Sequence, residues 1–211
     1  IGLDVTVLEM EERILKRVST PEMSAFYHEL HTSRGVDIRT ETIVSGFEGE
    51  TNVTSVICGD KKIPAQLVIV GIGIIPNVEL AQAAGLECDN GIVVDNHCRT
   101  ADPDIYAAGD CTNHPNSLLD RRLRLESVPN SMEQARVVST NMLGGDKAYA
   151  AIPWFWSDQY ELKLQMVGFS ADGDSSVVRG EKSSNEFAVF YMKEGKVVAV
   201  DAVNSPREFM V

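Results

Sequence analysis

A carboxylate at the end of a short apolar stretch is the feature of this sequence best suited to bind a ligand. The stretch runs from Thr100 to Asp110. Asp102-Pro103 indicates a turn, and Ile105–Ala108 is predicted to be a short buried strand that Gly109 ends. Asp110 then follows at the carboxyl end of a strand, where open α/β sheets place their ligand crevices. The alternative is that Asp110 only caps the next helix.

A second carboxylate, Glu9, ends a β-branched run that begins at Gly2. This pattern is typical of the second strand of a dinucleotide-binding unit, whose acidic residue holds the adenosine ribose. A carboxylate there favours NAD over NADP, because it repels a 2′-phosphate. The alternative is a solvated acidic turn that leads into a helix. The glycine fingerprint belongs roughly 20 residues earlier, so we expect the chain to start inside a domain.

Two glycines, Gly71 and Gly73, interrupt the apolar run from Val68 to Asn77. Glycine permits close approach of the backbone to a ligand, so this segment is a candidate contact for a nicotinamide or a pyrophosphate. A turn that simply needs glycine explains the pair equally well.

The composition excludes several classes of partner. The chain has 211 residues and a formal net charge of −12, which argues against nucleic acid and against an anionic membrane as partners. No apolar run approaches the roughly 20 residues of a membrane helix, and four cysteines without a Cys-x-x-Cys motif indicate a reducing compartment. We therefore expect a soluble, cytoplasmic protein. His28 and His31 lack a third ligand nearby, so no metal site is predicted.

The hydrophobic periodicity predicts an α/β protein in which a parallel sheet carries a small antiparallel insertion. Helices are expected over Pro21–Thr32, over Asn77–Gly85, and from Ser131 to about Leu143 with Asn130 or Ser131 as its cap. The expected strands, in chain order, are Gly2–Glu9, Val36–Arg39, Thr42–Phe47, Val53–Cys58, Gln66–Val70 and Ile92–Asp95.

A different composition begins at about Lys147. An aromatic cluster after Pro153 is followed by period-two runs divided by glycines, which predict an antiparallel sheet in a smaller α+β domain that is cut short at Val211. The expected domains are residues 1–77, 78–146 and 147–211.

The segment Asn113–Arg124 is predicted to be a loop. It holds Arg121, Arg122 and Arg124 in an otherwise acidic chain. These arginines offer a positive patch to an acidic protein, or they are ordinary solvated charges; the sequence favours neither.

The stretch ending in Asp110 closely resembles the second flavin-binding motif of flavoprotein reductases that contain two dinucleotide-binding domains. Glu9, Val70–Asn77, Leu125–Asn130 and Pro153–Tyr160 extend the resemblance to ferredoxin reductases of the putidaredoxin/rhodocoxin reductase type, which serve cytochrome P450 and ring-hydroxylating oxygenase systems. The chain is thus similar to the FAD-dependent pyridine nucleotide oxidoreductases over nearly its whole length.

The resemblance implies roles for particular residues. Asp110, preceded by Gly109, matches the carboxylate that hydrogen-bonds a ribityl hydroxyl of FAD. The backbone of Val128 matches the position that approaches the flavin pyrimidine edge, and Trp156 matches an aromatic beside the isoalloxazine. Pro129 stands where a glutamine or a similar residue is expected, and only the backbone before it is implicated in the contact.

The implied function is electron transfer from NADH through FAD to a [2Fe–2S] ferredoxin that serves a cytochrome P450 or a dioxygenase, with no side chain as acid, base or nucleophile. The alternatives are a non-catalytic NAD/FAD-binding or docking module and a rubredoxin- or disulfide-type flavoprotein reductase. The 211 residues alone are expected to be inactive and free of flavin, since neither glycine-rich phosphate turn is present. Homodimers are also plausible, because surfaces that match absent strands tend to associate.

Overall fold

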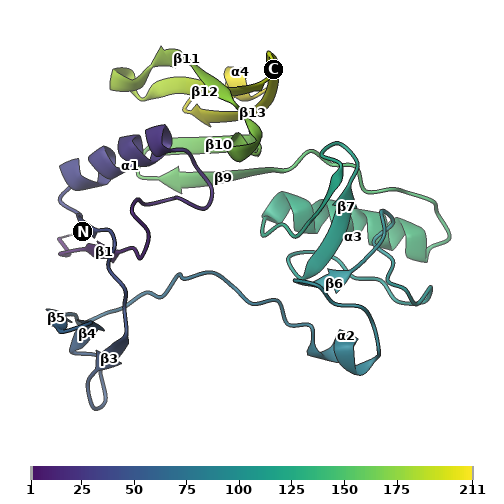
Figure 1. Ribbon diagram of the computed structural model, residues 1–211, viewed down its shortest axis with the longest axis horizontal. Coiled ribbons are helices and arrows are strands. Elements are labelled where there is room, and N and C mark those ends of the chain that lie inside the picture. The colour runs from purple at the N-terminus through teal and green to yellow at the C-terminus, as the bar shows by residue number, and fades with distance from the viewer. Residues whose placement is uncertain (1, 211) are drawn as a thin grey trace. The chain divides into compact units, whose positions relative to one another are not determined.

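The computed structural model describes residues 2–210. The chain divides between Gly73 and Ile74 into two compact units (Figure 1). Each unit contains at least one helix, a parallel strand pair and antiparallel strands. The predicted α/β class, with parallel pairing and an antiparallel insertion, is confirmed. No helix within residues 2–210 is both long and apolar enough to cross a bilayer.

The first unit is built on a parallel pair linked through a helix. Strand β1, Thr6–Leu8, pairs in parallel with β2, Asp37–Arg39, and α1, Pro21–Ser33, lies between them in the sequence. The helix begins where predicted, because Thr20 is extended and the fixed φ of Pro21 suits a first turn. The buried positions of α1 are Met23, Ser24 and Tyr27.

An antiparallel meander follows in the same unit. Its strands are β3, Gly46–Glu48, β4, Ser55–Cys58, and β5, Lys61–Pro64, in that spatial order. Strand β3 overlaps only the end of the predicted strand Thr42–Phe47, and β4 lies inside the predicted strand Val53–Cys58, whereas β5 was not predicted. Its two lysines and its proline suit an edge strand, which presents one side to water and does not need every N–H paired.

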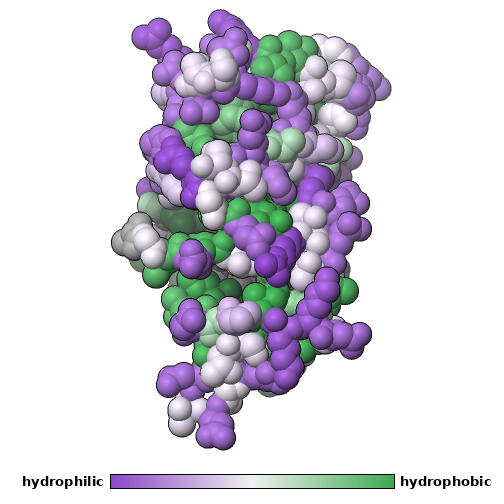
Figure 2. All heavy atoms as spheres, turned by 90° about the vertical axis from the view of Figure 1, so that its left-hand side faces the viewer, coloured by the Kyte–Doolittle hydropathy of each residue, from purple (hydrophilic) through white to green (hydrophobic). Residues whose placement is uncertain are grey.

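The predicted strand Gln66–Val70 is wrong. This apolar segment has no regular strand structure and no ladder partner among residues 2–210. Leu67 is 75% exposed and Ile69 is 88% exposed. A strand exists only through hydrogen bonds to a neighbouring backbone, so an apolar run without such a neighbour remains exposed. Green areas in Figure 2 show that apolar side chains reach the molecular surface.

The second unit opens with a small mixed sheet and two helices. Its elements are α2, Glu79–Ala83, β6, Ile92–Val93, β7, Thr112–Asn116, β8, Arg121–Leu123, and α3, Val128–Met142. Strand β6 pairs in parallel with β7, and β7 pairs antiparallel with β8. The segment from 113 to 124, predicted to be a loop, therefore contains most of a hairpin.

The predicted strand Ile105–Ala108 is also wrong. Its backbone folds back on the segment just before it, through a single bridge between Arg99 and Tyr106. Because this local pairing occupies its hydrogen bonds, the stretch does not join the sheet. Asp110 consequently lies in the turn that leads into β7, and does not follow a strand.

The second unit ends in a five-stranded antiparallel sheet of order β11-β12-β13-β10-β9 (Figure 1). The period-two pattern that predicted this sheet is confirmed, and β12 carries a fully buried run of apolar residues from 187 to 189. The strands are β9, Trp154–Gln159, β10, Leu162–Gly168, β11, Ser175–Glu181, β12, Glu186–Lys193, and β13, Lys196–Val203. Short helical turns complete it: η1, Ser170–Asp172, η2, Lys182–Ser184, and α4, Pro206–Phe209.

Candidate functional site

The turn at Gly109 is packed directly against α3. Gly109 has a φ of +88°, in the left-handed region, and a Cβ at this position would lie 3.3 Å from Ser131 Oγ. Its N–H donates to Gln134 Oε1 at 2.7 Å. Glycine therefore satisfies two demands at once, a left-handed backbone and close approach of the helix.

Asp110 presents its carboxylate to solvent at this turn. Ser131 Oγ donates to Asp110 Oδ1 at 2.9 Å, and Arg124 Nη1 donates to the Asp110 carbonyl at 3.1 Å. Within residues 2–210, Oδ2 has no hydrogen-bond donor. The alternative that Asp110 caps the next helix is wrong, because a strand follows it and α3 is capped by Ser127.

The N-terminus of α3 presents the backbone N–H of Val128 as a free donor. Ser127 Oγ accepts from Asn130 N at 3.3 Å, and the Ser127 carbonyl accepts from Ser131 N at 3.0 Å. The cap thus lies three or four residues before the predicted Asn130 or Ser131. Pro129 has no N–H, and the N–H of Val128 has no acceptor in the described part of the chain. Together with the positive end of the helix dipole, it suits an electron-rich ligand atom.

Trp156 lies on β9, the outermost strand of the second sheet. It is 40% exposed, and its ring stacks at a tilt on Trp154, with 5.6 Å between centroids. Trp154, and not Trp156, lines a small hollow beside Ser127 and Pro129 at the start of α3. The structure thus brings Gly109, Asp110 and the first turn of α3 together, with the tryptophan pair beside that turn.

The three arginines that suggested a positive patch each contact acceptors within the second unit. Arg121 makes a bidentate ion pair with Asp172, with both N–O distances 2.8 Å. Arg122 and Arg124 bind acceptors that lie 28 and 34 residues earlier in the chain: the carbonyl of Val94 and the side chain of Asn90. These contacts give the arginines a structural role in holding the hairpin.

The remaining predicted site residues belong to the first unit. Glu9 follows β1, and its Oε1 accepts the N–H of Glu11 at 2.9 Å. Gly73 has a φ of +95°, and a Cβ there would come within 2.9 Å of Arg17 Nη1, whereas Gly71 faces open space. A glycine is therefore required by local geometry at Gly73 but not at Gly71.

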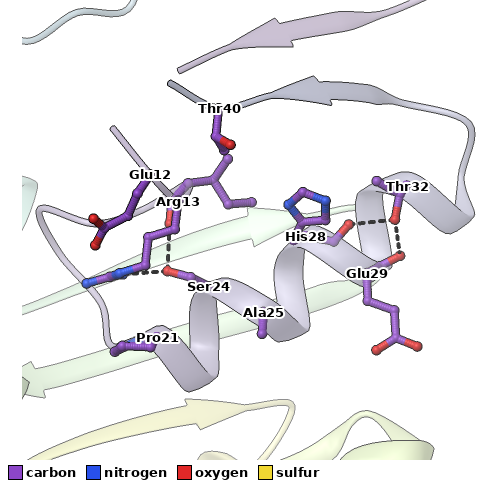
Figure 3. Close-up of a pocket in the computed structure, with 10 residues that line it drawn as sticks. Glu12, Arg13, Pro21, Ser24, Ala25, His28, Glu29, Thr32 and Thr40 are labelled. Carbon is purple, nitrogen blue, oxygen red and sulfur yellow. Dashed lines mark hydrogen bonds between the residues drawn. The ribbon is translucent and has the colours of Figure 1, made fainter. Parts of the chain in front are cut away.

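A hollow of about 460 Å³ lies on the first unit along α1 (Figure 3). Arg13 crosses it and donates to Ser24 Oγ at 2.6 Å. Glu9 is not among the lining residues, so this hollow is separate from the predicted ribose contact. His28 lines the hollow, but the described residues contain no group of three metal-ligating side chains.

The residues that hold the Gly109–Asp110 turn were not predicted. Ser131, Gln134 and Arg124 each donate to or accept from it. A signal was present in the sequence: polar residues recur at helical spacing on the buried face of α3, at Asn130, Gln134 and Asn141. Buried polar side chains require partners, and this spacing places those partners on one side of the helix.

Cys98 is expected to resist thiol reagents in the folded protein. It is fully buried, and burial together with the negative charge of Asp95 raises its pKa to about 12. At pH 8 only about one such thiol in ten thousand is ionised. Iodoacetamide followed by peptide mass mapping should label the half-buried Cys58, Cys88 and Cys111 and spare Cys98, while denaturant should expose all four. Labelling of Cys98 at the rate of Cys111 in the native protein would contradict the burial.

Comparison with known proteins identifies the class. Residues 1–135 match the family described as Pyridine nucleotide-disulphide oxidoreductase, and residues 154–211 match Reductase C-terminal. The chain belongs to the pyridine nucleotide-disulphide oxidoreductase family.

Its relatives include named reductases. The chain is 52% identical to putidaredoxin reductase CamA of Pseudomonas putida, over 99% of this chain and 50% of that protein. It is 44% identical to the ferredoxin–NAD(+) reductase component of the anthranilate 1,2-dioxygenase system of Burkholderia cepacia, over 99% and 52%. The structure matches the covalent putidaredoxin reductase–putidaredoxin complex with a TM-score of 0.93 and 51% identity, over 99% and 51% of the two chains. The chain spans about half the length of the curated relatives it matches.

Proposed function

We propose that the protein is an NADH-dependent, FAD-containing ferredoxin reductase that delivers single electrons to a [2Fe–2S] ferredoxin, which in turn serves a cytochrome P450 or a ring-hydroxylating oxygenase. When bound, FAD supplies the conversion of a two-electron hydride into one-electron steps. The observation that carries the proposal is the Gly109–Asp110 turn packed on the N-terminal turn of α3. The names of relatives at 44% and 52% identity support it.

The residues of the second unit fit a flavin dinucleotide. Asp110 Oδ2 is exposed and unoccupied by the chain, so it is suited to accept from a sugar hydroxyl. Val128 N–H, at the positive end of α3, is suited to donate to an oxygen at the pyrimidine edge and to favour negative charge there. Trp156 offers an aromatic face, and Gly109 leaves room for close approach. No side chain acts as an acid, a base or a nucleophile in this proposal.

The first unit is assigned to the nicotinamide dinucleotide. Glu9 retains one carboxylate oxygen, Oε2, for a ribose hydroxyl, which favours NADH over NADPH. Gly71 and Gly73 are proposed to permit close approach of that cofactor. We assign residues 1–77 to an NAD-binding domain, residues 78–146 to an FAD-binding domain and residues 147–211 to an interface domain. The cytoplasm is the proposed location.

The test uses a hybrid in which this chain replaces the matching half of Pseudomonas putida putidaredoxin reductase. The hybrid is expected to purify with FAD, and NADH should bleach its flavin band at near-stoichiometric amounts, with NADPH less effective. Reduction of putidaredoxin should follow. The 211-residue chain by itself is the control, and we expect it to be free of flavin. A hybrid that holds FAD but is not reduced by NADH would reject the reductase function and favour a binding module.

A further inference from the structure

A buried chain of polar side chains connects the Gly109 turn to the first turn of α3. Gln134 accepts from Gly109 N–H at 2.7 Å and from Thr112 Oγ1 at 2.8 Å, both through Oε1. Its other amide atom, Nε2, contacts His114 Nδ1 at 3.0 Å. Gln134 and Thr112 are fully buried and His114 is 1% exposed.

The chain of contacts continues from His114 to the helix start. The His114 and Tyr149 rings meet edge to face, with centroids 5.0 Å apart and planes at 90°. Tyr149 Oη donates to Asn130 Oδ1 at 2.9 Å, and Asn130 Nδ2 donates to the Leu125 carbonyl at 3.1 Å. Asn130 lies two residues after Val128, so the two parts of the proposed flavin site are joined through the protein interior.

The orientation of the Gln134 amide is determined by its neighbours. The Gly109 N–H can only donate, so the amide oxygen of Gln134 must face it. The Thr112 hydroxyl is compatible with this orientation, since its single proton goes either to Gln134 Oε1 or to the Gly109 carbonyl, each at 2.8 Å. The NH₂ group then faces His114 Nδ1, which accepts from it in the tautomer that carries the ring proton on Nε2. Nε2 is buried and has no hydrogen-bond partner within residues 2–210. Turning the amide over would set NH₂ against N–H and bury unsatisfied donors.

We propose that Gln134 is a positioning residue of the flavin site, and that it fixes the Gly109–Asp110 turn relative to the N-terminus of α3 through His114, Tyr149 and Asn130. This inference rests on the proposed function. Gln134 does not touch the ligand. It holds the backbone of Gly109 so that the Asp110 carboxylate and the Val128 N–H present a fixed pair of polar groups to FAD, and such preorganisation contributes to affinity.

The test compares Gln134→Met, which keeps the volume and removes both polar functions, with Gln134→Glu, which keeps the acceptor. Asn141→Leu is the matched control, because Asn141 is another buried amide on the same helix face, bonded to His97 and Lys147. The first measurement is hydrogen exchange of the Gly109 amide in the 211-residue chain. The second is FAD affinity of the hybrid reductase.

Gln134→Met is expected to accelerate exchange at Gly109 and to weaken FAD binding by about tenfold. Asn141→Leu should lower the urea midpoint comparably and change neither measurement. Gln134→Glu should restore slow exchange and raise the pKa of His114, visible in its ring proton resonances, because a carboxylate accepts from Nδ1–H. This resonance shift also tests the contact if Gln134→Met fails to fold.

Two outcomes would overturn the assignment. In the first, Gln134→Met and Asn141→Leu show the same hydrogen exchange at Gly109 and the same FAD affinity. In the second, Gln134→Glu leaves the His114 resonances unchanged. Failure of the wild-type hybrid to bind FAD would instead reject the proposed function. Gly109 exchange in the 211-residue chain would then still decide whether Gln134 holds the turn.

Discussion

Lowering the pH from 7 to 4 is expected to remove about 3 kcal/mol from the free energy of unfolding of the unit Ile74–Val211 through His114 alone. Burial, with a smaller contribution from the positive charge of Arg122, lowers the pKa of His114 to about 4 in the folded state, against an ordinary 6.5. Between pH 4 and pH 6.5, His114 is protonated in the unfolded chain but remains neutral in the folded chain. Stability is therefore complete above pH 6.5 and is lost as the pH falls toward 4.

The contact with Gln134 determines what protonation of the His114 ring does to the surrounding structure. A protonated His114 carries N–H at both nitrogens, so Nδ1 no longer accepts from the Gln134 amide. The amide cannot turn over without breaking its bonds to Gly109 and Thr112. Protonation of one buried ring thus disrupts the turn that holds Asp110.

Urea unfolding at a series of pH values, followed by tryptophan fluorescence, measures this effect. Both tryptophans of the chain, Trp154 and Trp156, lie in the second unit, so the signal reports on that unit. In wild type, the free energy of unfolding should fall between pH 6.5 and 4. His114→Gln should remove the part of this fall that His114 causes, although it lowers stability at neutral pH. His97→Gln, at the unit's other histidine, is the matched control and should retain the slope. If the free energy of unfolding of His114→Gln falls with pH as steeply as that of wild type, His114 is not the cause of the lost stability.

Replacing Asp110 by asparagine is expected to weaken FAD binding to the hybrid reductase by about thirty- to a hundredfold, equivalent to about 2–3 kcal/mol. The amide keeps the shape of the side chain and can still accept from Ser131 Oγ. It lacks the charge that strengthens a bond from a sugar hydroxyl, and it places an NH₂ group toward the ligand if its oxygen faces Ser131.

Titration of the deflavinated hybrid with FAD, followed by quenching of flavin fluorescence, gives the affinity. Asp104→Asn is the matched control. Asp104 is an exposed aspartate in the same stretch, Thr100–Asp110, and its substitution removes the same charge as Asp110→Asn. This substitution should leave the FAD affinity within about twofold, as expected for a solvent-exposed charge that does not contact the ligand. Equal affinities for the two variants would mean that Asp110 does not contact FAD.

The candidate site was partly predictable because its polar groups belong to short local patterns. Gly109 and Asp110 stand together in the chain, and the helix that supplies Val128 was expected close to its observed position. The groups that hold them were not, since Gln134 lies 25 residues after Gly109 and nothing local shows that they meet. The roles of Glu9 and Trp156 stay predictions.

The sequence by itself determined the elements whose causes are local. Helix α1 begins at Pro21 because proline suits the first turn, and the C-terminal antiparallel sheet follows from period-two runs divided by turns. Only the tertiary structure decided which apolar runs become strands, because a strand needs a hydrogen-bonding neighbour from elsewhere in the chain. Ile105–Ala108 pairs locally instead, and residues 66–70 find no neighbour among the described residues, so equal apolar character led to different structures.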